Sequence, residues 1–265
     1  GFFQDQILVS YGLRWDNYSD ASNHLSPRFG IVHKINDHWR QKFLYGHAYR
    51  APTANEMSGA STSVIANPNL KAETIDTFEY VIMYQQPHIS MEFVLFESDW
   101  YDAIALKPVT NLGSTNQYQN INRNRSQGLE FTINKQMENW SIKWVNSYTD
   151  SKSISEDQDY QAFPKYMSSV NIEHKSDNQK TILGTWYRHM QDYALGDDHS
   201  LFNERDELYQ RLDLYAYWKL SKDTQIGLQI QNLFDENLTL PSYYGSEGGW
   251  QDISRNVSLS LQQNF

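Results

Sequence analysis

The sequence predicts an all-β fold, a transmembrane antiparallel β-barrel, and three observations lead to that fold class. Apolar and polar residues alternate with a period of two from end to end, short and long connections alternate between the predicted strands, and aromatic residues are in surplus. The mean hydropathy of -0.70 is compatible with this fold, because a barrel strand shows lipid only at every second residue. No apolar run approaches the length of about eighteen residues that a membrane-spanning helix needs.

The period-two alternation is clearest at the end of the chain. We expect Val257, Leu259 and Leu261 to face one way, and Ser258 and Ser260 to face the other. Similar alternation occurs in residues 7–15, 77–84, 211–218 and 225–230. A β-sandwich gives the same pattern with its apolar face inward, so alternation alone leaves the sandwich and the barrel open.

Connection lengths favour the barrel. About twelve strands are predicted, many of them as long as the roughly 9–11 residues that a tilted strand needs to cross a bilayer. Tight turns are predicted at residues 36–37, 86–87, 137–139, 176–178 and 221–223. Longer polar connections alternate with them at residues 18–25, 51–72, 101–117, 151–163, 192–206 and 235–251. Short periplasmic turns on one rim and long extracellular loops on the other are typical of outer-membrane barrels.

Composition restricts the function classes. The net charge of -10 argues against a nucleic-acid partner, because phosphate neutralisation requires a surplus of Lys and Arg. The absence of cysteine excludes a disulfide scaffold and a thiolate metal site. Eighteen Tyr and eight Trp exceed the needs of a core of this size, and such rings gather at membrane interfaces or at sugar-binding surfaces. A secreted all-β carbohydrate-binding module is therefore the alternative function.

An enzyme is the class that the sequence supports least. It contains no Gly-x-Ser-x-Gly elbow, phosphate-binding loop or His-Glu-x-x-His motif, and no spacing singles out a carboxylate pair among the 32 acidic residues. We therefore expect no catalytic residue, no structural metal and no resident cofactor.

Two motifs flank the second long connection. They are Tyr49-Arg50-Ala51-Pro52 and Asn67-Pro68-Asn69-Leu70. Taken alone, Pro52 and Pro68 mark points where strand pairing stops, because proline cannot donate to a ladder. Together, the two motifs resemble the FRAP-type and NPNL-type boxes of TonB-dependent outer-membrane receptors, in the same order and strand context.

Three further segments resemble the same family. Residues 25–30 are similar to its LSPR-x-G strand entry, and residues 124–130 to the strand that follows a long loop. Asn232, Leu233 and Phe234 resemble the N-L-F-D motif of the penultimate strand. The terminal Phe265, which follows alternating apolar residues, resembles the signal that the barrel insertion machinery reads. The two boxes and these three segments, five motifs in the correct order, are together specific to the family.

The resemblance implies a barrel of twenty-two strands filled by an N-terminal plug that carries the TonB-contacting box. With about twelve strands, residues 1-265 are expected to be the C-terminal portion of the β-barrel domain, without the plug. The implied location is the outer membrane of a Gram-negative bacterium. The implied partners are outer-membrane lipid, the insertion machinery and, through a plug outside this chain, the TonB energy-coupling complex.

The family imports iron chelates, chiefly siderophores and haem, along with cobalamin and some saccharides. The amino-acid sequences of the two boxes are most similar to those of the haem and haemoglobin receptor branch. In that branch, a loop histidine between the boxes contacts haem. Residues 53–66 contain no histidine. A ferric siderophore and haem therefore both stay open as transported ligand, and we prefer the siderophore.

A haem-binding receptor of this topology would need an outward histidine as iron ligand. His24, His47, His189 and His199 are the candidates, whereas the other four histidines fall near the periplasmic rim. His199 follows two aspartates, so a divalent-cation site is an alternative there. A solvated loop histidine is the competing interpretation for each.

Aromatic and arginine side chains are the remaining candidates for contacting a chelate. Stacking rings and forked guanidinium donors suit catecholates, porphyrins and anionic chelates. The ligand-binding candidates are Arg50, Tyr243, Tyr244, Trp250, His199 and His24. The arginines expected to face the lumen, where they would offer such donors, are Arg14, Arg28, Arg50, Arg123, Arg125 and Arg211. The competing interpretations are a membrane girdle for the aromatics and ion pairs within the barrel wall for the arginines.

Overall fold

The computed structural model describes residues 2–4, 6–17, 23–59, 63–109, 115–121, 123–155, 157–159, 163–193, 207–240 and 250–264. The chain divides into two compact units, each described by itself below. The first is formed by Gly1–Val81, Leu95–Gln127 and Ser151–Asp159, and the second by Ile82–Val94, Gly128–Asp150 and Tyr160–Phe265. None of the helices within the described ranges has the length and apolar character needed to cross a membrane.

Nearly every element is a strand, and four strands continue from one unit into the other. The first unit holds β1 (Phe2–Gln4), β2 (Ile7–Asp16), β3 (His24–Lys34), β4 (Trp39–Arg50), α1 (Ala54–Ser58), β5 (Val64–Ile65), β8 (Ala103–Pro108), β9 (Asn116–Ile121) and β12 (Gln158–Asp159). The shared strands are β6 (Glu73–Gln86), β7 (Ile89–Tyr101), β10 (Asn124–Gln136) and β11 (Trp140–Ser153). The second unit holds β13 (Tyr166–Lys175), β14 (Thr181–Tyr193), β15 (Glu207–Lys219), β16 (Thr224–Gln231), β17 (Thr239–Leu240), β18 (Trp250–Gln251) and β19 (Asn256–Gln263).

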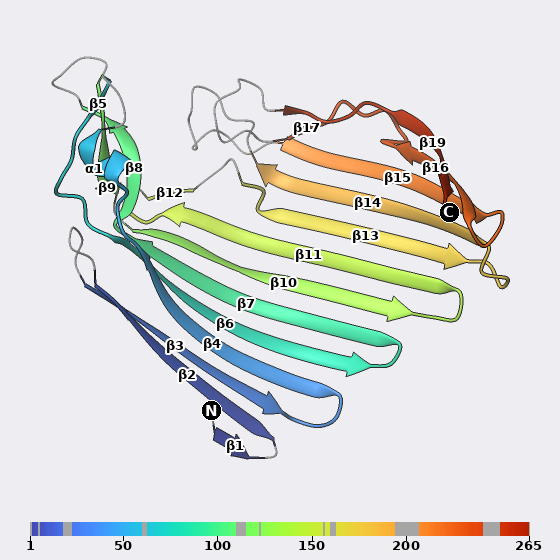
Figure 1. Cartoon of the computed structure of the whole chain (residues 1–265), viewed down its shortest axis with the longest axis horizontal. Helices are drawn as coiled ribbons and strands as arrows, with labels where there is room; N and C mark the ends of the chain where they lie inside the picture. The colour runs from blue at the N-terminus through green and yellow to red at the C-terminus, as the bar shows by residue number, and fades with distance from the viewer. Residues whose placement is uncertain are drawn as a thin grey trace. The chain divides into compact units, whose positions relative to one another are not determined.

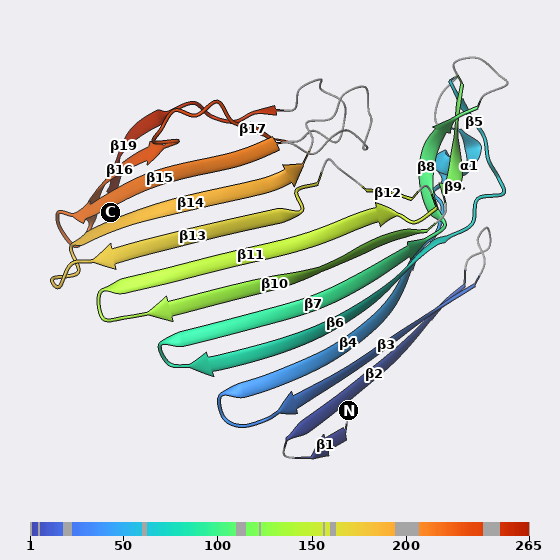
Figure 2. The ribbon, with the colours of Figure 1, turned by 180° about the vertical axis from the view of Figure 1, so that it is seen from behind.

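The strands pair in sequence order as a meander, which confirms the predicted all-β architecture. The order is β1-β2-β3-β4-β6-β7-β10-β11-β13-β14-β15-β16-β19, with β12 beside β11 (Figure 1). In the described residues this sheet has fourteen strands, and twelve remain when the very short β1 and β12 are set aside. The predicted tight turns lie between β3 and β4, β6 and β7, β10 and β11, β13 and β14, and β15 and β16, as Figure 2 shows from behind.

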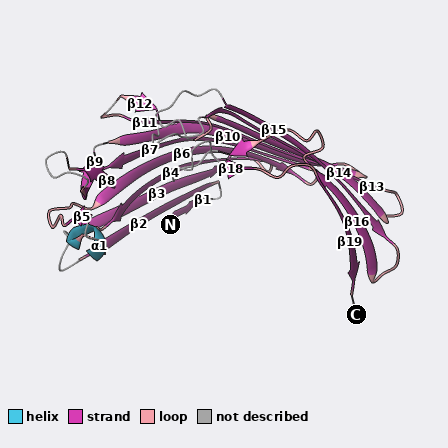
Figure 3. Ribbon diagram, turned by 90° about the horizontal axis from the view of Figure 1, so that it is seen from above, coloured by secondary structure: helices cyan, strands magenta, loops and turns pink. Residues whose placement is uncertain are grey.

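The predicted long connections contain structure that the sequence analysis did not foresee. The connection from β4 to β6 includes α1, drawn in cyan in Figure 3, and β5. The connection from β7 to β10 includes β8 and β9, and these two strands form a small separate sheet with β5. The segment that forms β9 is mostly polar and lacks the apolar alternation that marks the other strands, so no strand was predicted there.

Each unit presents one apolar face and one polar face. In the first unit, Tyr11 lies opposite Phe29, Phe29 lies opposite Tyr45, and the rings of Tyr45 and Phe78 are 4.8 Å apart. In the second unit, the register places Leu214 beside Ile230, Ile230 beside Val257 and Leu228 beside Leu259. Alternation along each strand then assigns the intervening residues to the polar face. These two faces agree with the predicted alternation.

The apolar face is open rather than packed. Leu183 is 48% exposed and Leu259 76% exposed. A β-sandwich would cover such a face with a second sheet, but a membrane barrel presents it to lipid. Buried apolar residues are few in the described ranges: Ala72, Val81, Ala103, Tyr193, Tyr209 and Leu238. Their scarcity favours a ladder of strands with lipid on one side over a fold built around a central core.

The polar face includes a close approach that requires glycine. The ring of Tyr215 lies over Gly184, its partner across β14 and β15, so that any Cβ at Gly184 would overlap the ring. The Tyr215 hydroxyl accepts a hydrogen bond from Asn171 at 3.1 Å. Tyr215 therefore lies flat across the polar face of the second unit.

Candidate functional site

The first box begins the only helix in the described part of the chain. Pro52 ends strand pairing and Thr53 caps α1: the Thr53 hydroxyl accepts from Glu56 N at 3.3 Å, and the Glu56 carboxylate accepts from Thr53 N at 2.7 Å. This reciprocal arrangement is a capping box. The helix ends at Gly59, whose φ of 82° favours glycine. Strand β4 thus ends just before Pro52, and α1 begins directly after Thr53.

The guanidinium group of Arg50 joins the end of β4 to two other elements. Its Nη1 and Nη2 donate to the two carboxylate oxygens of Glu56 at 3.0 and 3.1 Å, and its Nε donates to Glu73. Glu73 is only 7% exposed, and its second oxygen accepts from Ile104 N at 2.9 Å. Arg50 therefore connects β4 to α1 and to the start of β6, and Glu73 extends the connection to the start of β8. The forked pair with Glu56 is a strong, oriented contact.

These contacts favour the ionised form of the Glu56 carboxyl group. Burial raises the pKa of its carboxyl group, but the hydrogen bonds from Arg50 and Thr53 outweigh burial, and the pKa lies below its usual 4.5. Glu56 is therefore ionised at neutral pH and pairs with Arg50.

The second box contacts both α1 and β9 through Asn67. Asn67 N donates to Met57 O at 2.8 Å, and the Asn67 amide donates to Tyr118 O at 2.8 Å. Asn120 exchanges two hydrogen bonds with the Lys71 backbone, accepting from N at 2.8 Å and donating to O at 2.9 Å. The described residues in the ranges 50–59, 63–73, 101–109 and 115–121 thus form one connected structure, here called the box module. Figure 1 shows its elements α1, β5, β8 and β9 together at one end of the first unit.

Asn232, from the predicted N-L-F-D motif, is an architectural residue of the second unit. It is 1% exposed, has a positive φ of 50°, and its backbone N donates to Asp213 at 2.8 Å. Its amide donates to the carbonyl oxygens of Glu236 and Ile253 at 2.8 and 3.1 Å. Asn232 thereby ends β16 and joins both ends of the following connection. Leu233 N donates to Leu212 O at 2.8 Å, and Phe234 is exposed.

A buried ionic cluster follows on the polar face of the second unit. Arg211 donates to Asp213 and to Asp252, both at 2.8 Å, and the Tyr209 hydroxyl donates to Asp252 at 2.6 Å. Arg188 also pairs with Asp213. For Arg211, these contacts agree with the wall ion pair that was the competing interpretation of the lumen-facing arginines.

Two of the outward histidines, His47 and His189, lie on the apolar faces of their units. In the first unit, His47 Nδ1 lies 2.9 Å from Asp76, which also accepts from the Tyr45 hydroxyl, so His47 shares the apolar face with Tyr45. In the second unit, His189 alternates with Arg188 and shares the apolar face with Tyr187. Both were predicted as possible iron ligands, and this placement turns them away from the polar face.

His24 differs from those two histidines. It lies across from Asp16 at the start of β3, and its ring stacks on the first-box residue Tyr49 with centroids 4.2 Å apart and planes 17° apart. No group of three or more His, Cys, Asp or Glu residues that could hold a metal ion occurs in the described ranges. The His24 and Tyr49 rings form the aromatic pair of this site.

Of the other predicted site residues, the structure describes only Trp250. Trp250 lies opposite Leu240 in the β17 and β18 pair and is largely exposed. His199, Tyr243, Tyr244 and Phe265 lie outside the described residues. The sequence analysis missed Glu73 and Asn120, which hold the box module together.

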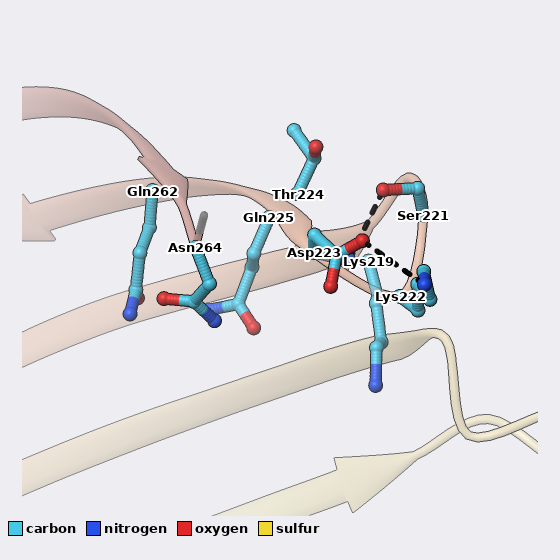
Figure 4. A pocket seen from close by; sticks show the side chains of 8 residues that line it. All are labelled: Lys219, Ser221, Lys222, Asp223, Thr224, Gln225, Gln262 and Asn264. Atoms are coloured by element: carbon cyan, nitrogen blue, oxygen red, sulfur yellow. Dashed lines mark hydrogen bonds and ion pairs between the residues drawn. The ribbon is translucent and has the colours of Figure 1, made fainter.

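A small pocket lies beside a tight turn of the second unit. It is lined by Lys219, Ser221, Lys222, Asp223, Thr224, Gln225, Gln262 and Asn264, around the tight turn between β15 and β16 (Figure 4). Because short turns mark the periplasmic rim, this pocket does not lie where an arriving cargo would bind.

Two relatives and two solved structures are similar to this chain over most of its length. The ferric enterobactin receptor of Pseudomonas aeruginosa is 24% identical, over 87% of this chain and 36% of its own length. The heme/hemopexin utilization protein C of Haemophilus influenzae is 27% identical, over 99% and 42%. A crystal structure of a mutant ferric enterobactin receptor from Pseudomonas aeruginosa has a TM-score of 0.79 at 19% identity, over 99% and 43%. The siderophore receptor from Acinetobacter baumannii has a TM-score of 0.77 at 17% identity, over 99% and 44%.

The chain spans less than half the length of these proteins. The structural likeness concerns the fold. The family described as TonB dependent receptor-like, beta-barrel matches residues 2–233, which is most of the chain. The chain therefore belongs to the TonB-dependent receptors of the Gram-negative outer membrane, as part of their β-barrel.

Proposed function

We propose that residues 1–265 form the C-terminal portion of the barrel of a receptor that takes up an iron chelate. The observation that carries this proposal is the box module, in which both family boxes are joined through Arg50, Glu73 and Asn120. The named relatives include receptors for ferric enterobactin and a heme/hemopexin utilization protein, which supports an iron chelate as cargo. A secreted carbohydrate-binding module is not favoured, because its family and relatives would differ.

We propose a ferric siderophore rather than haem as the preferred cargo. Haem iron takes a protein ligand such as histidine, whereas siderophore iron arrives enclosed by oxygen ligands and needs none. His47 and His189 lie on the apolar face, and His24 stacks on Tyr49. Recognition of a siderophore would fall to aromatic rings and guanidinium groups.

The contacts of Arg50 change the role proposed for it. All three of its nitrogen atoms donate to Glu56 or Glu73. We therefore propose that Arg50 positions the box module, and that the chelate is contacted by His24, Trp250, Tyr243 and Tyr244, with His199 as a further candidate. Energy coupling through TonB would act on a plug outside residues 1–265, and Phe265 would be read by the insertion machinery.

The experiment compares cargoes in the complete receptor. The four histidines His24, His47, His189 and His199 are replaced by Ala, and growth is measured with a ferric catecholate siderophore or with haem as sole iron source. Siderophore-dependent growth close to that of the unmodified receptor is expected. A receptor that supports growth on haem, and loses that growth in the quadruple variant, would show that haem is the cargo.

A further inference from the structure

Basic side chains are concentrated on the polar face of β2, β3 and β4 in the first unit, which lie side by side (Figure 1). Arg28 and Lys42 alternate with Phe29 and Phe43, which belong to the apolar face. In an outer-membrane barrel the polar face lines the lumen. The cross-strand pairs on this face include Arg28 with Gly46, Val32 with Lys42, and Lys34 with Arg40.

Two other arginines that were expected to face the lumen do not share this face. Arg123 and Arg125 both donate to Asp99, at 2.8 and 3.0 Å. Ser98, the neighbour of Asp99, lies 3.1 Å from the Thr77 hydroxyl on the polar face. Alternation therefore places Asp99 and both arginines on the apolar face, and the predicted lumen position of these two arginines was wrong.

Two of the cations on the polar face already have an acidic partner. Arg14 pairs with Asp16 at 2.8 Å, at the outer end of β2. Lys34 pairs at 2.6 Å with Asp37, in the tight turn after β3, and Asp37 also interacts electrostatically with Arg40. Asp16 is the only acid on the polar face among the residues that the register pairs in β2, β3 and β4. These two pairs leave three cations whose charge is not neutralised.

Those three cations are Arg28, Lys42 and Arg40. Within the described ranges, the side chains of Arg28 and Lys42 make no hydrogen bond or ion pair. Lys42 is half-buried, and a charge that is partly withdrawn from water without a partner is unfavourable. Glu79 on β6 shares the polar face, because it alternates with Phe78 on the apolar face. A single carboxylate does not neutralise three cations, so this part of the lumen wall favours an anion.

Glycine leaves open space beside Arg28. Its partners across the two neighbouring strands are Gly12 on β2 and Gly46 on β4. Among the described residues, no atom lies within 4 Å of the position that a Cβ at Gly46 would take. At Gly12, only the Cβ of Arg28 itself comes as close as 4.0 Å. The Arg28 side chain is exposed, so its guanidinium group is accessible to an anion in the lumen.

The three cations lie between the middle of the barrel and its periplasmic end. Lys34 ends β3 at a tight turn, and Arg28 lies on the same strand, farther from that turn. At about 3.3 Å per residue and a tilt of about 40°, the intervening residues rise by about 15 Å, compared with about 25 Å for the whole apolar band. Lys42 lies between these levels, opposite Val32, and Arg40 lies opposite Lys34. Arg28, Lys42 and Arg40 are here called the basic track.

We propose that the basic track guides an anionic iron chelate along the lumen wall, from the middle of the membrane to the periplasm. A ferric catecholate is an anion, because its phenolate oxygens carry more negative charge than the ferric ion neutralises. Separate cations attract an anion without holding it at one position, which is what passage through a pore requires. The proposal rests on the proposed uptake of an iron chelate, and it adds the part of the wall along which the chelate leaves.

The test separates binding from transport in the complete receptor. Arg28→Gln combined with Lys42→Gln should slow the uptake of a radiolabelled ferric catecholate by roughly tenfold. Binding of the same chelate to cells without TonB, which reports the outer site, should stay unchanged. Lys180→Gln combined with Lys222→Gln is the matched control, because it removes the same charge from two tight turns of the second unit. This control should leave both uptake and binding unchanged.

Two single variants test the space and the charge separately. Gly46→Leu fills the open space beside Arg28 without changing any charge, and it should slow uptake while binding at the outer site persists. Arg28→Lys keeps the charge and should retain uptake. Heat-modifiable mobility on gels verifies that each variant is folded.

Uptake by the double glutamine variant equal to that of the unmodified receptor would overturn the basic track. A parallel loss of outer binding would also overturn it. So would a lower melting temperature of this variant without chelate, because the cations would then hold a plug side chain rather than the chelate. An unmodified receptor that takes up no ferric catecholate would overturn the proposed function together with the track, so the two failures are distinguishable.

Discussion

Arg50 and Glu56 form a two-pronged pair, with donor to acceptor distances of 3.0 and 3.1 Å, between the end of β4 and helix α1. They are six residues apart in sequence, and Glu56 lies within the helix, whose first turn Thr53 caps. The first family box therefore ends β4, and its Arg50 binds the helix that follows back to the end of that strand.

Replacing Arg50 by Ala should loosen the box module. The buried Glu73 would lose its charged partner, and an unsatisfied buried acceptor costs roughly 1–3 kcal/mol. We expect faster amide exchange in residues 50–73 of the complete receptor, measured by mass spectrometry. Arg14→Ala is the control, because the Arg14 side chain is largely exposed where it pairs with Asp16, and exposed ion pairs contribute little to stability. Similar exchange in the two variants would argue against the proposed role of Arg50.

The box module should weaken in acid through Glu56. Its pKa is lower in the folded protein than the usual 4.5, so its stabilising contribution is fully present above that pH and is lost as the pH falls through the folded value. Pepsin cleavage within residues 50–73 should therefore increase below about pH 4.5. Glu56→Gln should reduce this pH dependence, and an unchanged dependence would show that another group is responsible.

The two faces of β16 should differ in their tolerance of charge. Leu228 lies beside Leu259 on the apolar face, and Gln229 lies on the polar face. Leu228→Arg should destabilise the barrel by roughly 2–4 kcal/mol if it is near the middle of the membrane. Gln229→Arg should cost much less, as measured by denaturant unfolding in lipid vesicles. Equal costs would mean that the faces are misassigned.

Asn232 should matter more than its neighbour Phe234. Asn232→Ala removes hydrogen bonds to Glu236 and Ile253 from a fully buried position, which should cost roughly 1–3 kcal/mol. Phe234→Ala changes an exposed side chain and should alter stability by only about 0.5 kcal/mol. The same unfolding measurement checks both variants, and a larger effect at Phe234 would contradict the role given to Asn232.

Much of the fold follows from local pattern, whereas the site does not. The tight turns and the apolar face of β16 and β19 were predicted because period-two alternation is a local signal. The contact between Asn120 and Lys71 joins residues 49 positions apart, and no local pattern reveals it. Arg125 was expected to face the lumen because its side chain is charged. It instead pairs with Asp99, whose neighbour Ser98 contacts Thr77 on the polar face, so Arg125 lies on the other face, and only this contact between strands reveals its orientation.

The most direct test of the central claim is the uptake rate of radiolabelled iron into cells whose only iron-chelate receptor is the complete form of this protein. Iron is supplied as a ferric catecholate siderophore or as haem, in cells with and without TonB. We predict uptake from the siderophore that stops when TonB is deleted. Absence of TonB-dependent uptake from either chelate, in cells whose outer membrane contains the folded receptor, would contradict the assignment of an iron-chelate receptor.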